Sequence, residues 1–335
     1  MGELNNVLNV YMNKPERIQS VLEYYLREKL PKEWADCCDD ADDFYTVRTK
    51  SGKVSFRQRD IFKRISLKGQ QYFVGIENQA DSNLTFPWRL MQMDCLAYER
   101  QIEQIQQKNI KQKVRYSAED DYKYRFQKND RIEPIINLVL YWGRRKWKSP
   151  LDLREMLDLS GLPESINKLV EGYEIHLINM WELSGSHLEA MDSDLKYILG
   201  LMKCEGSHTE FEEYILQHKE FFSKIPKSAV DVLDVCMNIR ELKQYLTYMD
   251  SQEGEKEADM CKALKDSLKH ARNEGRQQGI EQGIEQGIEQ GMQHMLILMH
   301  KMSEAGEGGM LARLSEEPEF LKQMYEKYQI GRIRA

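Results

Sequence analysis

The run PIINLVLYWG, which extends from Pro134 to Gly143, is the feature that most constrains the fold of this chain. Its apolar residues follow one another almost without interruption. A strand with one face in water alternates apolar and polar residues, whereas an apolar run of this kind is typical of a strand buried on both faces, such as a central parallel strand. The run therefore predicts a sheet that is covered on both sides, which means an α/β fold.

Two further runs predict strands, and they lie close together in the sequence. DIFKRISL covers Asp60–Leu67 and YFVGIENQ covers Tyr72–Gln79. Both are rich in β-branched and aromatic residues, and the connection KGQQ between them favours a hairpin. We therefore expect the two strands to pair in an antiparallel manner.

Helices are predicted on either side of this hairpin. PERIQSVLEYYLREKLP, from Pro15 to Pro31, carries apolar residues at helical spacing between two prolines. FPWRLMQMDCLAYERQIEQIQQ, from Phe86 to Gln107, has Pro87 in its first turn, where proline is tolerated. The first part of the chain therefore mixes strands and helices.

Glu77 and Gln79, at the end of the second predicted strand, are candidates for a functional site. Residues i and i+2 of a strand share a face, so these two side chains point the same way. If Leu67 pairs with Tyr72, then Asp60 faces Gln79 and lies diagonal to Glu77, with roughly 7–8 Å between the backbones. Two carboxylates at that separation can hold one divalent cation, and an all-oxygen site suits Mg²⁺ or Mn²⁺.

The pairing register and the interpretation of these residues each have an alternative. A register slip of one residue would move Asp60 to the other face of the sheet. The plainer interpretation of the same residues is a strand that ends in a polar loop.

Basic residues surround Asp60 in the sequence. Between Arg48 and Lys68, Asp60 is the only acid. The eight bases of this segment are Arg48, Lys50, Lys53, Arg57, Arg59, Lys63, Arg64 and Lys68. Bases that attract a polyanion, together with an acid that holds a metal, are what a phosphate-handling site needs. A second basic segment, Lys108–Arg131, is interleaved with aromatic residues, but it also fits a solvated loop.

After Ser149 the pattern of the chain changes. Helical spacing dominates as far as Asp250, in the segments SPLDLREML, NKLVEGYEIHLINMWEL, SDLKYILGLMK and SAVDVLDVCMNIRELKQYL. From Ser251 the chain is charged and repetitive. We therefore expect an α/β domain over residues 1–148, a helical domain over 149–250 and a charged helical tail over 251–335.

The tail contains the repeat GIEQGIEQGIEQG, from Gly279 to Gly291. On a helix, the glycines and the isoleucines that follow them form two adjacent columns, with glutamate and glutamine on the opposite side. Small residues at every fourth position let two helices approach closely, which predicts a homo-oligomer formed through the tail. A flexible spacer is the alternative.

Charge and composition narrow the possible partners. The net charge is −7, yet residues 1–148 hold 27 bases against 21 acids, so an anionic partner is expected at the first part of the chain. No apolar run is long enough to span a membrane, and the first residues do not resemble a secretion signal. With six scattered cysteines, we expect a cytoplasmic protein with free thiols and no membrane partner.

These segments together resemble a known family. RDIFKRISLKGQQYFVGIENQ, FPWRLMQMDCLAYERQ and PIINLVLYWGRRKWKSPLDLREML are similar to the bacterial recombination-promoting nuclease/putative transposase family. That family belongs to the PD-(D/E)XK nuclease superfamily. The resemblance implies a restriction-endonuclease-like mixed sheet flanked by helices. It also implies a metal-dependent DNA endonuclease with a link to recombination or mobile elements.

The resemblance also implies roles for particular residues. Asp60 and Glu77 match the metal ligands, and Gln79 stands where the superfamily usually has a catalytic lysine. An acid on the first helix is common in the superfamily, and Glu23 and Glu16 are the candidates here. DNA contact falls to the bases near Asp60, namely Arg57, Arg59, Lys63, Arg64 and Lys68.

The glutamine at position 79 leaves a second function open. A chain that has lost the catalytic lysine could be a weak or inactive transposase-like protein that binds DNA or assembles on it. A helical assembly protein that works through its tail is a third possibility. A test for metal-dependent cleavage of DNA distinguishes the endonuclease from the weak or inactive DNA-binding protein.

Overall fold

The computed structural model describes residues 3–48, 54–115, 123–251 and 254–331. The chain forms two compact units, Met1–Leu264 and Lys265–Ala335. Among the described residues, no helix has both the length and the apolar character that a membrane crossing needs.

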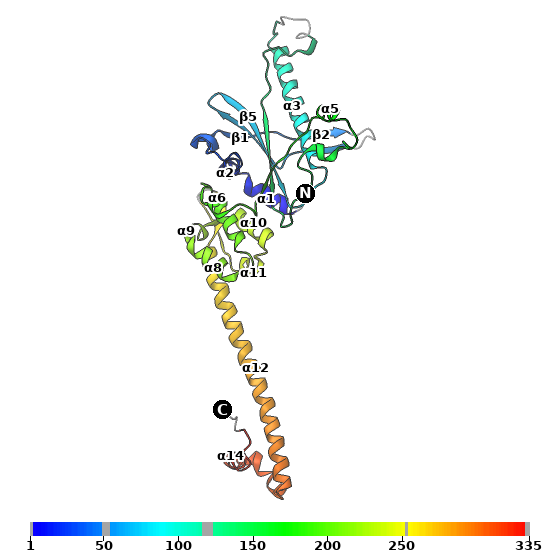
Figure 1. Ribbon diagram of the computed structural model, residues 1–335. Coiled ribbons are helices and arrows are strands. Elements are labelled where there is room, and N and C mark those ends of the chain that lie inside the picture. Colours follow the sequence, from blue (N-terminus) through cyan, green and yellow to red (C-terminus); the bar gives the residue numbers. More distant parts are fainter. Residues whose placement is uncertain (1–2, 49–53, 116–122, 252–253, 332–335) are drawn as a thin grey trace. The chain divides into compact units, whose positions relative to one another are not determined.

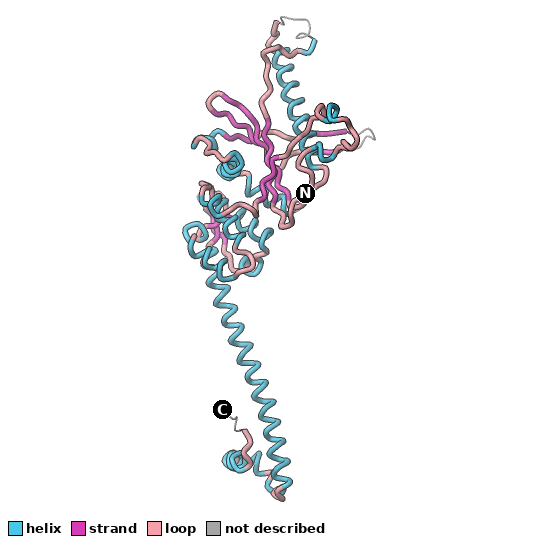
Figure 2. The backbone as a smooth tube through the Cα atoms, viewed as in Figure 1, coloured by secondary structure: helices cyan, strands magenta, loops and turns pink. Residues whose placement is uncertain are grey.

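The first unit is built on a mixed sheet, whose strands are magenta in Figure 2. Its five strands have the order β1-β4-β5-β6-β7. The strands are β1 (Cys38–Asp40), β4 (Ile61–Leu67), β5 (Gln70–Gln79), β6 (Ile135–Tyr141) and β7 (His176–Asn179). The pairs β1–β4 and β4–β5 are antiparallel, whereas β5–β6 and β6–β7 are parallel. The prediction of a central parallel strand in PIINLVLYWG is confirmed.

Helices cover both faces of this sheet (Figure 1). Helices α1 (Glu3–Met12) and α2 (Pro15–Leu26) lie on one face, and α3 (Phe86–Lys111) lies on the other. Alternate residues of β6 enter different cores: Leu138 and Leu140 pack in the core shared with α1 and α2, and Val139 packs against α3. This explains why the sequence of β6 is apolar at successive positions.

The second part of this unit differs from the all-helical domain that we expected. Strand β7 lies inside NKLVEGYEIHLINMWEL and completes the main sheet. Its four residues cannot be told from a buried helical segment by periodicity alone. The core around α1 and α2 continues into the helices that follow, so the structure has no domain boundary at residue 148.

Several shorter elements complete the first unit. The helices of its second part are α5 (Glu164–Asn167), α6 (Gly185–Glu189), α7 (Leu195–Lys203), α8 (His208–Gln217), α9 (Lys219–Phe222), α10 (Lys227–Met237) and α11 (Arg240–Lys243). A small sheet joins β8 (Ile225–Pro226), β10 (Lys256–Ala258) and β9 (Tyr248–Asp250), and a hairpin joins β2 (Tyr45–Arg48) and β3 (Val54–Arg57). No disulfide bond is found among the described residues.

The tail is dominated by one helix, α12 (Met260–Glu304), which contains the whole Gly-Ile-Glu-Gln repeat. The last turns of α12 pack against α13 (Arg313–Glu316) and α14 (Pro318–Lys327) around Leu298, Met302 and Phe320. The repeat itself lies before this small core and is exposed along its length.

Candidate active site

The β4–β5 hairpin has a tighter turn than we expected. Two residues, Lys68 and Gly69, connect the strands, and both have positive φ angles, 52° and 82°. Such a pair is typical of a type I′ turn, which matches the twist of the strands that it joins. Leu67 therefore pairs with Gln70, and the expected pairing of Leu67 with Tyr72 is wrong.

The corrected register keeps Asp60 near Glu77. The observed pairing differs from the expected one by two residues, so the side chains of both strands stay on the faces of the sheet that we expected. The pairing ends with Ile61 opposite Ile76, and Asp60 lies just before β4, where its carboxylate accepts a hydrogen bond from the backbone N–H of Asn78, the residue after Glu77. The two carboxylates therefore lie at the same end of the sheet, as the site hypothesis requires.

Glu77 is completely buried and incompletely paired. Its Oε2 atom accepts hydrogen bonds from Arg89 Nη2 at 3.1 Å and from Gln79 Nε2 at 3.5 Å. Its Oε1 atom has no hydrogen-bond partner among the described residues. A buried polar atom without a partner is costly, so this oxygen is suited to a ligand that the protein alone does not supply.

Asp60 is held by groups from two other elements. Asn9 of α1 donates from Nδ2 to Oδ1 at 3.1 Å, and the backbone N–H of Asn78 donates to Oδ2 at 2.8 Å. Asn78 in turn donates to the side chain of Asn9 at 2.9 Å. These bonds fix the carboxylate at the rim of a cavity of about 800 Å³, which Asp60 and Arg89 both line.

The two carboxyl groups have raised pKa values. Burial raises the pKa of Glu77 to about 8, and the charge of Asp60 adds to this rise, while Arg89 and Arg59 oppose it. Burial also raises the pKa of Asp60, although its hydrogen bonds from Asn9 and Asn78 act against the shift. A cation between the groups would favour both ionised forms.

The residues present fit a divalent cation. Among the described residues there is no cluster of three or more histidine, cysteine, aspartate or glutamate side chains. A metal at Asp60 and Glu77 would therefore have two carboxylate ligands and would complete its shell with neutral oxygens. This donor set suits Mg²⁺, which commonly binds one or two carboxylates, substrate phosphate and water.

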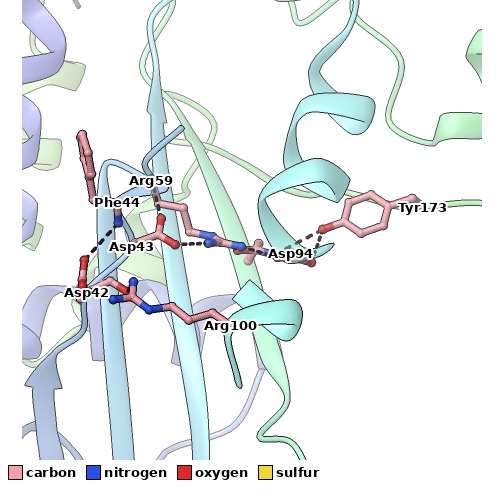
Figure 3. Close-up of polar contacts among 8 residues, drawn as sticks. Asp42, Asp43, Phe44, Arg59, Asp94, Arg100 and Tyr173 are labelled. Atoms are coloured by element: carbon pink, nitrogen blue, oxygen red, sulfur yellow. Dashed lines mark hydrogen bonds and ion pairs between the residues drawn. The ribbon is translucent and has the colours of Figure 1, made fainter. Parts of the chain in front are cut away.

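A buried polar network supports the strand end that carries Asp60 (Figure 3). Arg59 Nη1 binds Asp43 Oδ1 at 2.6 Å, and its Nε donates to Asn137 Oδ1 at 2.9 Å. Its Nη2 forms an ion pair with Asp94 of α3, which also accepts a hydrogen bond from Tyr173 at 2.5 Å. The network connects Arg59, the residue before Asp60, to α3 and to β6. It therefore positions the candidate site.

A glycine in β5 makes room for this network. A Cβ atom built at Gly75 would lie 2.4 Å from Asn137 Oδ1 and 2.9 Å from Arg59 Nε. Both distances are far below van der Waals contact, so only glycine fits here without a shift of the buried groups. A glycine inside a strand pattern is a known sign of such a close approach.

The predicted DNA-binding bases fall into different environments. Arg57 lines the cavity beside Asp60. Arg59 and Lys63 are buried, and each pairs with aspartate, so neither can meet DNA in this structure. Arg64 pairs with Glu133, and Lys68 pairs with Glu33 at 3.3 Å. Lys50, Lys53, Tyr116 and Tyr122 lie outside the described residues.

Glu23, a candidate for the acid on the first helix, does not line the cavity of Asp60. Glu23 lies on α2, where it accepts a hydrogen bond from Gln19 at 2.8 Å and pairs with Lys29 at 2.9 Å. It lines a different cavity from Asp60. The helix that reaches Asp60 is α1, and its contribution is the amide of Asn9. Glu16, the other candidate, lies in the first turn of α2 and not on α1.

The comparison with protein families bears on this arrangement. A family model described as a putative transposase, YhgA-like, matches residues 6–233. That is more than half of the chain. The chain belongs to the YhgA-like putative transposase family. No curated protein and no solved structure matches it.

The match to the YhgA-like family includes the whole main sheet with Asp60, Glu77 and Arg89, and it ends within α10. The repeat in α12 lies outside the matched residues. The family assignment therefore concerns the part of the chain that carries the candidate site.

Sequence reasoning missed several residues of this site in the YhgA-like chain. Asp94 lies at helical spacing with the buried residues Leu90, Met93 and Ala97. A single acid in an apolar stripe is a sign of a buried partner, because an unpaired charge is costly there. Arg89 and Asn9 give no comparable signal, since each is one polar residue near a helix end.

Proposed function

We propose that the protein is a metal-dependent DNA endonuclease of the PD-(D/E)XK type, which hydrolyses phosphodiester bonds in recombination or the spread of mobile elements. The observation that carries the proposal is the unpartnered Oε1 atom of buried Glu77, at the same end of the sheet as Asp60. The membership of a putative transposase family supports DNA as the substrate.

Each residue of the site has a role in this proposal. Asp60 and Glu77 hold Mg²⁺ or Mn²⁺. When bound, the metal lowers the pKa of water and neutralises charge on the phosphate. Arg57 and Arg89, which line the same cavity, attract the phosphodiester backbone. Gln79, which is close enough to bond to Glu77, positions the attacking water.

Incubation with supercoiled plasmid DNA tests the function directly. The purified protein should convert the plasmid to relaxed circles with Mg²⁺ and should leave it intact with EDTA. The absence of cleavage with both Mg²⁺ and Mn²⁺ would contradict the nuclease proposal. Binding of the plasmid without cleavage would favour the inactive DNA-binding alternative.

Gln79 should contribute less to cleavage than the two carboxylates. An amide cannot act as a base in the useful pH range, but it can hold water and phosphate by hydrogen bonds. We therefore expect Gln79→Ala to slow nicking by about 10²-fold or less, the lower end of general acid–base effects, with near-normal Mg²⁺ dependence.

A lysine at the same position provides the matched comparison. Gln79→Lys should retain nicking, and its pH–rate profile should show an ionisation that the wild-type profile lacks. If Gln79→Ala is as inactive as a variant of Asp60, then Gln79 is a ligand or a structural support, and the positioning role is wrong.

We further propose that α12 associates with α12 of a second copy. Gly275, Gly279, Gly283, Gly287 and Gly291 would each cost a lone helix about 1 kcal/mol against alanine. Added Cβ atoms there would meet no other described atom within 4 Å. Beside them, Ile280, Ile284 and Ile288 are about half exposed. Packing that offsets the glycines and covers the isoleucines is therefore expected from a second chain.

Charge placed on one face of α12 tests this association. Replacing Ile280, Ile284 and Ile288 together by glutamate should lower the molar mass in light scattering. The matched control replaces Gln282, Gln286 and Gln290 by glutamate, which adds the same charge outside the isoleucine column, and it should leave the mass unchanged. An equal mass for all three proteins would favour the spacer interpretation.

A further inference from the structure

Three exposed aromatic side chains surround the cavity that contains Asp60. Phe44 is 53% exposed, Phe56 is 60% exposed and Trp88 is 45% exposed. All three line the same cavity as Asp60 and Arg89. Large aromatic side chains are usually buried, so a group of them beside a polar site indicates a binding surface.

These rings come from two separate elements. Phe56 lies on β3, Phe44 directly precedes β2, and the two rings stack with centroids 5.2 Å apart at 28°. Trp88 lies in the first turn of α3 and lines the same cavity. We call these three residues the aromatic platform (Phe44, Phe56 and Trp88).

The part of the platform that lies on the β2–β3 hairpin is anchored next to Asp60. The β2–β3 hairpin is closed at its base by the buried pair of Asp43 and Arg59, in which the backbone N–H of Arg59 also donates to Asp43 Oδ2 at 2.6 Å. Arg59 directly precedes Asp60. Because Arg59 anchors the hairpin and directly precedes Asp60, the hairpin that carries Phe44 and Phe56 is held beside the carboxylate.

Positive charge accompanies the rings. Arg57 and Arg89 line the cavity, and the Nε atom of Arg57 is buried without a hydrogen-bond partner among the described residues. The cavity of about 800 Å³ lies within the range of small-ligand sites, ~300–1,000 Å³. Aromatic faces next to arginine are the combination that binds the bases and phosphates of single-stranded nucleic acid.

We propose that the aromatic platform binds an unstacked base of DNA, so that the site prefers a nucleotide that is single-stranded or unpaired. In a duplex the faces of each base are covered by its neighbours, and only an unstacked base can lie against these rings. The inference rests on the proposed function for the identity of the ligand. It adds that the bound nucleotide must be unpaired, either before the protein binds or as a result of binding.

Binding of labelled oligonucleotides tests the platform without cleavage. In EDTA, fluorescence anisotropy would compare a single strand with the blunt duplex of the same sequence. Trp88→Ala should weaken single-strand binding by roughly 5- to 150-fold, the effect of losing one stacked base. Binding of the duplex should change by less than about twofold, because it depends mainly on phosphate contacts.

Two further variants make the result specific. Trp88→Phe keeps an aromatic face and should keep the single-strand affinity, but it should lose the quenching of indole emission that a stacked base causes. Tyr25→Ala is the matched control, because Tyr25 is an exposed aromatic residue on α2 and lines another cavity. It should bind as the wild type does. Unchanged single-strand binding by Trp88→Ala would overturn the proposal, as would an equal loss for the single strand and the duplex.

The plasmid assay separates this proposal from the proposed function. If the wild-type protein nicks plasmid but Trp88→Ala binds single strands normally, the proposed binding of a base by the platform is wrong and the nuclease proposal is supported. If the wild-type protein does not nick but Trp88→Ala loses single-strand affinity, the platform stands in a protein that only binds DNA.

Discussion

Replacing Asp60 by asparagine, or Glu77 by glutamine, is expected to reduce Mg²⁺-dependent nicking of plasmid DNA by roughly 10³-fold or more, because a metal ion contributes several kcal/mol of transition-state stabilisation. Each substitution keeps the size of the side chain and removes the charge that would hold the cation. Measured rates at several Mg²⁺ concentrations should show that metal affinity and maximal rate fall together.

Asp81 provides the control for this experiment. It is an exposed acid two residues after Gln79, so Asp81→Asn removes a charge near the site without touching the proposed ligands. Circular dichroism of all three variants would establish that they are folded. Nicking at the wild-type rate by either the Asp60 or the Glu77 variant would show that the assigned site is wrong.

Without metal, the free energy of unfolding is expected to fall as the pH rises from about 5 to about 8. Burial raises the pKa of Glu77 from 4.5 to about 8, so the folded protein holds a proton that the unfolded chain has released in this range. One such proton changes the free energy of unfolding by about 1.4 kcal/mol per pH unit. Above about pH 8 both states are ionised at this residue, and its contribution levels off.

Glu77→Gln is the matched variant for this experiment, because an amide of the same shape does not titrate. Thermal unfolding in EDTA should show that the wild type loses stability relative to the variant between pH 5 and pH 8. Calorimetry at pH 7 in buffers of different ionisation enthalpy should show that Mg²⁺ binding releases about one proton. Parallel stability profiles, or metal binding without proton release, would contradict the raised pKa.

The central features of the fold could be predicted from local sequence. The apolar run of β6 indicated a strand with two covered faces because both of its faces are buried here. Strand β7 could not be predicted in the same way, since its four residues make a short apolar segment that fits a helix equally well. Its pairing with β6 depends on contacts between distant parts of the chain.

The candidate site was predictable where local sequence decides, namely within the strand of Glu77 and Gln79 and across the hairpin that brings Asp60 to the same end of the sheet. Glu77 and Gln79 are neighbours on one face of β5, and periodicity alone shows this. Arg59 appeared to belong with the exposed bases of its segment, yet its partners Asp43 and Asp94 lie 16 and 35 residues away. A pattern of charges along the chain does not reveal which base is buried, because that depends on partners brought in by the fold.

The closed base of the β2–β3 hairpin has a consequence for engineering. Asp43 and Arg59 flank this hairpin, and their ion pair joins its two ends directly. The segment between them can therefore be exchanged as a module, with a new length or a new set of side chains, while the carboxylate that follows Arg59 keeps its support. Anyone who wishes to change what the protein recognises without disturbing Asp60 has a defined pair of splice points.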